Sequence, residues 1–290
     1  MTLSHESLIF LAWTLGPAAL LAVSNILQKV GLDRVAHRVH THRPGEWVRT
    51  VAQNLLWWCG IAIAAVATVG YYGALGRYNI SLVQPLMALN PVLTALVGWW
   101  ILKEHMDRRT GWAIVLVVVG LGCAGLLHGE ARGQEHQMRM LVFVAVSVGL
   151  ALSVRFVVFN VEARKSLIAG VGFGLSAVLM KSLEEHFHFH GGGNLQGSDW
   201  LGAPLWQVIG HVDIFLRAAG YVASYIIGFI YMQVALTHGR ALLVIPLTSA
   251  IGMLVPTLAG ILVFQEPCGF AKLGAVGLVM LGSALFVRLK

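Results

Sequence analysis

Long apolar segments recur along almost the whole chain, and polar residues are concentrated in the short stretches between them. Nine segments hold about 20 predominantly apolar residues each, the length of helix that crosses the hydrocarbon core of a bilayer. They cover residues 7–31, 51–75, 80–102, 110–128, 139–160, 166–186, 212–236, 241–264 and 270–288. The pattern predicts an all-α polytopic membrane protein with about nine transmembrane helices.

Composition agrees with this prediction. Of the 290 residues, 57% are hydrophobic and 11% are charged, whereas about a quarter of the residues of a soluble domain are charged. The first apolar run is longer than the core of a signal peptide and follows no basic segment, so we interpret it as a retained span. Cys59, Cys123 and Cys268 have neither the number nor the spacing of a disulfide framework or a metal-thiolate site.

Basic residues are distributed unequally between the two ends of the predicted spans. Twelve Lys and Arg residues lie in the connections on one side, against four on the other. Because cytoplasmic loops are enriched in Lys and Arg, we expect the N-terminus outside and the C-terminus in the cytoplasm, in a plasma membrane or bacterial inner membrane. This bias also accounts for the net charge of +7, and no compact basic face suggests nucleic-acid binding.

The first half of the chain recurs in the second half. The stretch "YYGALGRYNISLVQPLMALN" aligns with "MQVALTHGRALLVIPLTSAI", which places Pro85 on Pro246, and one inserted residue later Gly120 aligns with Gly282. The first four apolar segments therefore recur as the last four, and the odd fifth segment inverts the second copy in the membrane.

The alignment divides the chain into three parts. Residues 1–128 form the first four-helix repeat, residues 129–165 contain the linking fifth helix, and residues 166–290 form the second, inverted repeat. Inverted repeats are typical of secondary transporters, because the two copies can exchange roles between inward-facing and outward-facing states. The alternative is a duplication retained only for packing.

Polar side chains and prolines inside the apolar segments indicate where a solute could bind. Pro85 and Pro91 fall in one segment and Pro246 and Pro256 in its repeat-equivalent. Such interrupted helices are the best sequence indicator of a site at the bilayer midplane, although a kink can also serve packing alone.

The neutral polar residues of these segments form the candidate cavity lining. Gln84, Asn90 and Thr94 follow helical steps of three and four residues and so lie near one face. We expect the solute cavity to be lined by Gln84, Asn90, Thr94, Thr248, Ser249, Asn25, Gln28, Tyr71, Tyr72, Tyr231 and Gln233. The tyrosines could instead be anchors at the membrane interface.

Charged residues are scarce within the segments and lie near their ends. Lys29 and Lys181 either extend to an interface or act as counter-charges to an anionic solute. Glu104 and Glu266 lie at helix ends, where they could pair with basic loop residues or act in a gate. No Asp or Glu lies clearly at mid-span, and we interpret the His-rich stretch 184–193 as a flexible outer loop and not as a metal site. The chain lacks nucleotide-binding and hydrolase motifs, so we expect no cofactor and no enzymatic activity.

At this point the residues resemble a known family. The chain resembles the drug/metabolite transporter superfamily in four features. They are an "AL" pair before a polar turn, a proline-bearing helix, a "KE" at the end of that helix and a Gly-rich helix that follows. Within this superfamily the chain resembles the NIPA-type magnesium transporters. The resemblance rests on nine predicted spans with the N-terminus outside and on the segments "SNILQKVGL" and "SAVLMKSL". The second proline in "MALNPVLTALVG" is closer to the EamA-like metabolite exporters. The resemblance implies transport by alternating access.

These observations predict a secondary transporter for a small organic solute such as a polar metabolite, an amphiphile or a lipid precursor. Amides, hydroxyls and aromatic rings without a buried carboxylate suit such a solute better than a divalent ion. Magnesium transport is the alternative, and a non-transporting membrane subunit or receptor is a further one. The expected partners are membrane lipids and a small-molecule or ion substrate, with the chain a monomer or a homodimer.

Overall fold

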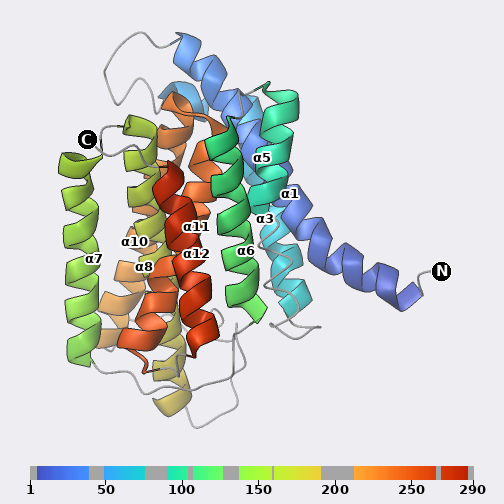
Figure 1. The fold of residues 1–290 in the computed structure, drawn as a ribbon. Helices are drawn as coiled ribbons and strands as arrows, with labels where there is room; N and C mark the ends of the chain where they lie inside the picture. The colour runs from blue at the N-terminus through green and yellow to red at the C-terminus, as the bar shows by residue number, and fades with distance from the viewer. Residues whose placement is uncertain are drawn as a thin grey trace.

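The computed structural model describes residues 5–38, 49–75, 90–103, 107–126, 137–158, 160–190, 212–265 and 269–286. Within these ranges there are nine helices, which lie side by side as a bundle except for the first half of α1, which projects away from it (Figure 1). They are α1 (His5–Arg38), α3 (Leu55–Leu75), α5 (Asn90–Ile101), α6 (Arg108–Leu126), α7 (Gln137–Val157), α8 (Val161–His190), α10 (Val212–His238), α11 (Ala241–Leu262) and α12 (Phe270–Phe286). Each predicted apolar segment overlaps one of these helices.

Within the described ranges, five helical segments are long and apolar enough to cross a membrane. They are Leu15–Val35, Gln137–Val157, Val161–Leu183, Asp213–His238 and Ala241–Leu262. Two further apolar helical segments, Leu55–Tyr71 and Leu273–Leu285, are shorter. The prediction of an all-α polytopic membrane protein is therefore confirmed, while the number of nine spans stays a prediction.

Three differences between predicted and observed boundaries are the largest. Helix α1 continues to Arg38, seven residues beyond the expected end at residue 31. The segment expected at 80–102 is described only from Asn90, where α5 begins, and residues 76–89 lie outside the described ranges. The expectation of a flexible loop around His186–His190 is wrong for the backbone, because α8 continues through His190. Its end coincides with the start of the run Gly191–Gly193, and glycine is among the residues least favourable to helix.

Helix α11 lies at the centre of the bundle and packs against α8, α5 and α12. Its first eight residues, 241–248, are all buried. A helix that is apolar all round is expected in such a position. The main hydrophobic core surrounds this end of α11, and a smaller one lies around Val255 and Phe264 near its other end.

The turn between α10 and α11 is fastened to the start of α8. The carboxylate Oε2 of Glu162 accepts a hydrogen bond of 3.0 Å from the backbone N–H of Arg240, the residue before α11. The backbone N–H of Glu162 in turn donates 3.1 Å to Oδ1 of Asn160, which caps α8. Since the first N–H groups of a helix have no partner within it, this contact both caps α11 and sets its position beside α8.

Helices α6 and α12 pack through a reciprocal pair of glycines. A Cβ placed on Gly120 would lie 2.9 Å from the carbonyl oxygen of Ala275, and one placed on Gly282 would lie 2.9 Å from the carbonyl oxygen of Ala113. Small residues allow this close approach of two helix backbones. Gly120 and Gly282 are positions that the alignment of the two halves of the sequence places together, and so are Ala113 and Ala275.

The ends of α5 and α11 also correspond. Lys103 and Gln265 are the only non-glycine residues with positive φ among those described, at 52° and 54°. Each follows its helix closely, where a left-handed residue commonly ends a helix. Each also directly precedes one of the aligned glutamates, Glu104 and Glu266, which lie outside the described residues.

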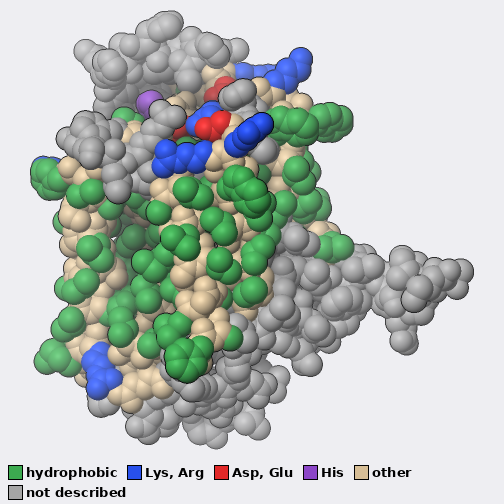
Figure 2. Space-filling view, viewed as in Figure 1, with side chains coloured by type: hydrophobic (Ala, Val, Ile, Leu, Met, Phe, Trp, Pro, Cys, Tyr) green, Lys and Arg blue, Asp and Glu red, His purple; other side chains and the backbone are tan. Residues whose placement is uncertain are grey.

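The flank of the bundle is apolar. Figure 2 shows hydrophobic side chains over the flank in view and Lys, Arg, Asp and Glu gathered mainly near one end. In α7 and α10 only 11% of the most apolar stretch is buried inside the protein. Exposed side chains such as Leu141, Phe156 and Ile226 are what a lipid-facing surface requires.

Candidate functional site

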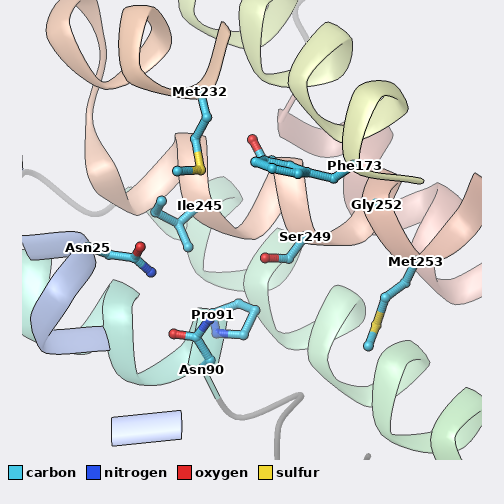
Figure 3. A pocket seen from close by; sticks show the side chains of 10 residues that line it. Asn25, Asn90, Pro91, Phe173, Met232, Ile245, Ser249, Gly252 and Met253 are labelled. Carbon is cyan, nitrogen blue, oxygen red and sulfur yellow. The ribbon is translucent and has the colours of Figure 1, made fainter. Parts of the chain in front are cut away.

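A cavity of about 300 Å³ lies in the centre of the bundle, between α1, α5, α8, α10 and α11. Its volume is at the lower end of the range of small-molecule pockets. The described residues that line it are Asn25, Asn90, Pro91, Phe173, Met232, Ile245, Thr248, Ser249, Gly252 and Met253 (Figure 3). None of them is charged.

The two asparagines of the cavity are connected through a threonine. Asn25 on α1 donates from Nδ2 to Oγ1 of Thr94 at 3.3 Å, and Thr94 donates to Oδ1 of Asn90 at 3.2 Å. Thr94 is fully buried and Asn25 is 9% exposed. The hydrogen bonds orient both amides at the wall of the cavity, since Thr94 lies one helical turn after Asn90 and behind it.

Pro91 lies in the first turn of α5, next to Asn90. The residue four positions before it, Met87, lies outside the described ranges. Pro246 and Pro256, in contrast, lie inside α11, and each leaves a carbonyl without its usual helical partner.

Residues of α8, α10 and α11 form the apolar side of the cavity. The ring of Phe173 meets that of Tyr225 edge to face, with centroids 5.4 Å apart. This geometry is favourable between aromatic rings, and it holds the Phe173 ring in place. Gly252 leaves the Phe173 side open, because a Cβ at Gly252 would meet Phe173 Cβ only at 3.8 Å.

The hydroxyl groups of α11 differ in their surroundings. Thr248 Oγ1 donates to the carbonyl oxygen of Ser166 at 3.4 Å. Ser249 lies at the cavity wall and its hydroxyl has no hydrogen bond to any described residue. Ser249 is therefore the cavity hydroxyl whose hydrogen-bonding capacity the described residues leave unused.

A second polar network lies beside the cavity. Gln233 on α10 donates to Oε1 of Gln28 on α1 at 2.6 Å and accepts from Nε1 of Trp57 on α3 at 3.0 Å. Gln28 donates to Ser24, which donates to the carbonyl of Gly60. The two glutamines are buried and bonded to one another, so they join three helices instead of lining the cavity.

The lysines expected as counter-charges have partners within the fold. Lys29 is buried and donates to the carbonyl oxygen of Leu236 and to Oδ1 of Asp33, both at 2.7 Å. Lys181 places its ammonium 4.3 Å from the centre of the Phe264 ring, a cation–π contact. Neither lysine lines the described part of the cavity.

The predicted site residues thus separate into groups. The cavity wall brings together Asn25, Asn90, Thr248 and Ser249, with Thr94 directly behind them. Tyr71 and Tyr231 do not line the described part of the cavity, and Tyr231 is 38% exposed. Gln84, Glu104 and Glu266 lie outside the described residues, as does the side chain of Tyr72. Within the described ranges, no group of three or more His, Cys, Asp or Glu could hold a metal ion.

The apolar half of the wall could not be recognised in the sequence. Phe173, Met232, Ile245 and Met253 are apolar residues in apolar helices, so no pattern separates them from residues that face lipid or the core. Gly252 could be recognised as a candidate, because it lies three residues after Ser249 and therefore on the same face of α11.

Comparison with known proteins identifies related sequences. The sequence model of the family described as Magnesium transporter NIPA matches residues 7–184, more than half of the chain. The Probable magnesium transporter NIPA9 of Arabidopsis thaliana is 24% identical over 83% of this chain and 71% of its own length. The Magnesium transporter NIPA3 of Pongo abelii is 29% identical over 33% of this chain, and the match spans only 23% of that relative.

A shorter relative belongs to a different functional group. The Probable 4-amino-4-deoxy-L-arabinose-phosphoundecaprenol flippase subunit ArnE of Pseudomonas savastanoi pv. phaseolicola is 31% identical over 24% of this chain and 62% of its own length. No solved structure matches the chain significantly. The matches confirm the resemblance to NIPA-type and related transporters.

Proposed function

Because this chain belongs to the Magnesium transporter NIPA family, we propose that it is a secondary membrane transporter whose solute binds in the central cavity. The observation that carries this proposal is that both halves of the chain contribute residues to the cavity wall. Asn25 and Asn90 come from the first half of the chain, and Phe173 and Ser249 come from the second. A site shared by both halves is accessible from either side when the halves rock against each other, which is alternating access.

The two halves are inverted repeats in this proposal, residues 1–128 and 166–290 joined by residues 129–165. The reciprocal contacts of Gly120 and Gly282 support it, since an exchange of the two copies leaves this pair of contacts unchanged. The matching backbone conformations of Lys103 and Gln265 at the ends of α5 and α11 support it as well.

We place the protein in a plasma membrane or bacterial inner membrane, with the N-terminus outside and the C-terminus in the cytoplasm. The unequal distribution of Lys and Arg between the loops supports this orientation. The gathering of charged side chains mainly near one end of the described surface agrees with it (Figure 2). The monomer or homodimer surrounded by lipid remains the proposed assembly.

The cavity chemistry best supports a small organic molecule as the solute. The described wall offers two amides, two hydroxyls, an aromatic ring and two thioethers, and no carboxylate. Magnesium is bound in proteins mainly by one or two carboxylates together with water or phosphate oxygens. The neutral wall therefore suits an organic solute better than a magnesium ion.

Magnesium transport is the second candidate, and the family match favours it. Two relatives that align with this chain carry the name of magnesium transporters. Because Mg²⁺ gives up its water reluctantly, it would pass this neutral cavity in hydrated form, with the amides bonded to its water ligands.

The two candidates separate in a thermal-shift screen of the detergent-purified chain, because a ligand that binds only the folded state raises its stability. Mg²⁺, Mn²⁺ and Co²⁺ are compared with amino acids, nucleosides, sugars and neutral amides. Asn25→Leu and Ser249→Leu alter the cavity, and Ser153→Leu, at an exposed position of α7, is the matched control. Uptake of each stabilising ligand is then measured in liposomes.

The proposal expects a ligand that stabilises the native chain and Ser153→Leu but not the cavity variants, and that crosses the membrane in liposomes. An organic ligand supports the first candidate, and millimolar Mg²⁺ supports the second. If a ligand bound and was never transported, the chain would be a receptor or subunit and the transporter proposal would be overturned.

A further inference from the structure

The central cavity has two chemically different ends. Figure 3 shows Asn25 and Asn90 together on one side, the hydroxyl of Ser249 directed toward them, and Met253 on the opposite side. We propose that the cavity selects an uncharged, amphipathic solute with a hydrogen-bond donor and acceptor at one end and a compact apolar or aromatic group at the other. This inference rests on the proposed transport function and defines the substrate class of the same site.

At the polar end, each asparagine uses only half of its amide within the protein. Asn25 donates through Nδ2 to Thr94, and its Oδ1 has no hydrogen-bond donor among the described residues. Asn90 accepts at Oδ1 from Thr94, and its Nδ2 has no acceptor among them. A buried polar group without a partner is unfavourable, so this end presents one acceptor and one donor for a solute.

The buried position of Asn25 makes this vacancy informative. The residue is only 9% exposed and lines the cavity, so a partner for its carbonyl has to come from within the cavity. Most buried polar atoms have a hydrogen-bond partner, and an exception needs an explanation. A solute that carries an amide, a urea or the edge of a nucleobase offers the complementary donor and acceptor side by side.

Charge selectivity follows from the surroundings of the polar end. No Lys, Arg, Asp or Glu lines the described cavity. The nearest lysine along α1, Lys29, bonds to Leu236 and Asp33 instead. A solute with a net charge would exchange its hydration for neutral dipoles without an ion partner, which is strongly unfavourable.

At the other end the wall can hold a flat apolar group. The Phe173 ring is held by Tyr225, and Met253 contributes a flexible thioether on the side opposite Asn25 and Asn90 (Figure 3). Methionine adapts to groups of different shape and makes favourable contacts with aromatic rings. Gly252 leaves space beside Phe173, because no atom other than backbone Gly170 O and Phe173 Cβ lies within 4 Å of a Cβ built there, both at 3.8 Å.

Gly252 provides a variant that tests this end without disturbing the fold. A Cβ at this position makes ordinary van der Waals contacts, so Gly252→Ala should fold normally and occupy part of the apolar end. Gly277 on α12 has no atom within 4 Å of such a Cβ. Gly277→Ala is therefore the matched control.

The experiment compares four probes on the 290-residue chain by thermal shift, with Mg²⁺ as a fifth. Benzamide, benzoate and benzylammonium share one ring and differ in charge, whereas acetamide keeps the amide without the ring. We expect benzamide to bind at least about tenfold more tightly than the other three. Gly252→Ala should weaken benzamide about tenfold or more and leave acetamide unchanged, and Gly277→Ala should change neither.

Three results would overturn the inference. Equal binding of benzoate or benzylammonium would refute charge selectivity, and equal weakening of acetamide and benzamide in Gly252→Ala would refute the two-ended cavity. Stabilisation and uptake of Mg²⁺ with every organic probe inert would refute the substrate class and leave the transporter proposal intact. If no ligand that binds the protein were taken up into liposomes, the proposed transport function itself would be refuted.

Discussion

The ammonium of Lys29 on α1 donates a hydrogen bond of 2.7 Å to the main-chain carbonyl oxygen of Leu236 on α10. The two helices belong to different halves of the chain, and the same ammonium pairs with Asp33 at 2.7 Å. A buried cation is stable only when its donors are satisfied. This contact therefore holds the two halves together beside the cavity.

The Lys29 contact predicts a stability effect that is separate from solute binding. Lys29→Met keeps the length of the side chain and removes the charged donor, so the free energy of unfolding should fall by about 1.5–3 kcal/mol, the contribution of a hydrogen bond to a charged group. Thermal denaturation in detergent measures the loss. Solute affinity should persist, and Lys165→Met, which removes the same charge near the start of α8, should have a smaller effect on stability. Unchanged stability with abolished solute binding would instead assign Lys29 as a counter-charge.

The paired glutamines predict a strong coupling energy. Gln28→Leu and Gln233→Leu each leave a buried amide without its partner, so each should destabilise the protein by about 1–3 kcal/mol. The double variant leaves neither amide unpaired, and its loss should be clearly smaller than the sum of the single losses. A double-mutant cycle by chemical denaturation measures the difference. Additive losses would show that the 2.6 Å contact contributes nothing.

The reciprocal glycines predict equal sensitivity at two distant positions in the sequence. Gly120→Ala and Gly282→Ala each place a methyl group within 2.9 Å of the facing backbone, so each should separate α6 from α12 and lower the yield and melting temperature of the folded protein. Gly274→Ala, in open space on the same α12, should be nearly neutral. Size-exclusion chromatography and thermal denaturation give the comparison. Tolerance of alanine at one of the two reciprocal positions alone would contradict their equivalence.

We expect the stability of the folded protein to depend on pH through Asp107. Its carboxylate accepts a hydrogen bond of 3.0 Å from the backbone N–H of Thr110 at the start of α6. Hydrogen bonds from the side chain and backbone of Thr110, with a smaller effect of the Arg240 charge, lower the pKa of Asp107 from its ordinary value. Because the folded-state pKa is lowered, the stabilising contribution is complete above the unfolded-state pKa and is lost as the pH falls through the folded-state pKa.

Melting temperatures recorded from neutral pH to about pH 3 test this assignment across the titration range of aspartate. Asp107→Asn should keep the cap at neutral pH and reduce the loss in acid. Asp107→Ala should lower the free energy of unfolding by about 1 kcal/mol at neutral pH, the typical effect of losing a helix cap. Identical acid profiles for the native chain and Asp107→Asn would refute the role of this carboxylate.

The sequence predicted the helices well and the cavity only in part, for physical reasons. The length of an apolar run can be counted in the sequence, so α7 and α11 begin and end close to their expected bounds. Asn25 and Ser249 were identifiable because a polar side chain inside a membrane segment needs a partner. Met253 was not, because lipid, core and cavity all accept a thioether.

Contacts to the backbone were equally hidden. Lys29 could be expected to reach an interface or a solute, but its partner is the carbonyl of Leu236, and every residue carries a carbonyl. The end of α8 at His190 was missed because the alternation of His and Phe gives no helical period. Only the following glycines mark the boundary.

The contact between α6 and α12 has a consequence for the ancestry of the fold. In a two-fold symmetric dimer, a residue of one subunit meets a partner whose own counterpart makes the same contact in return. Gly120 with Ala275 and Gly282 with Ala113 follow that rule within a single chain. Under the proposed inverted repeat, a half-length ancestor with one such glycine would have paired with a second copy of itself through this helix, and fusion of two copies of its gene would have made the interface internal.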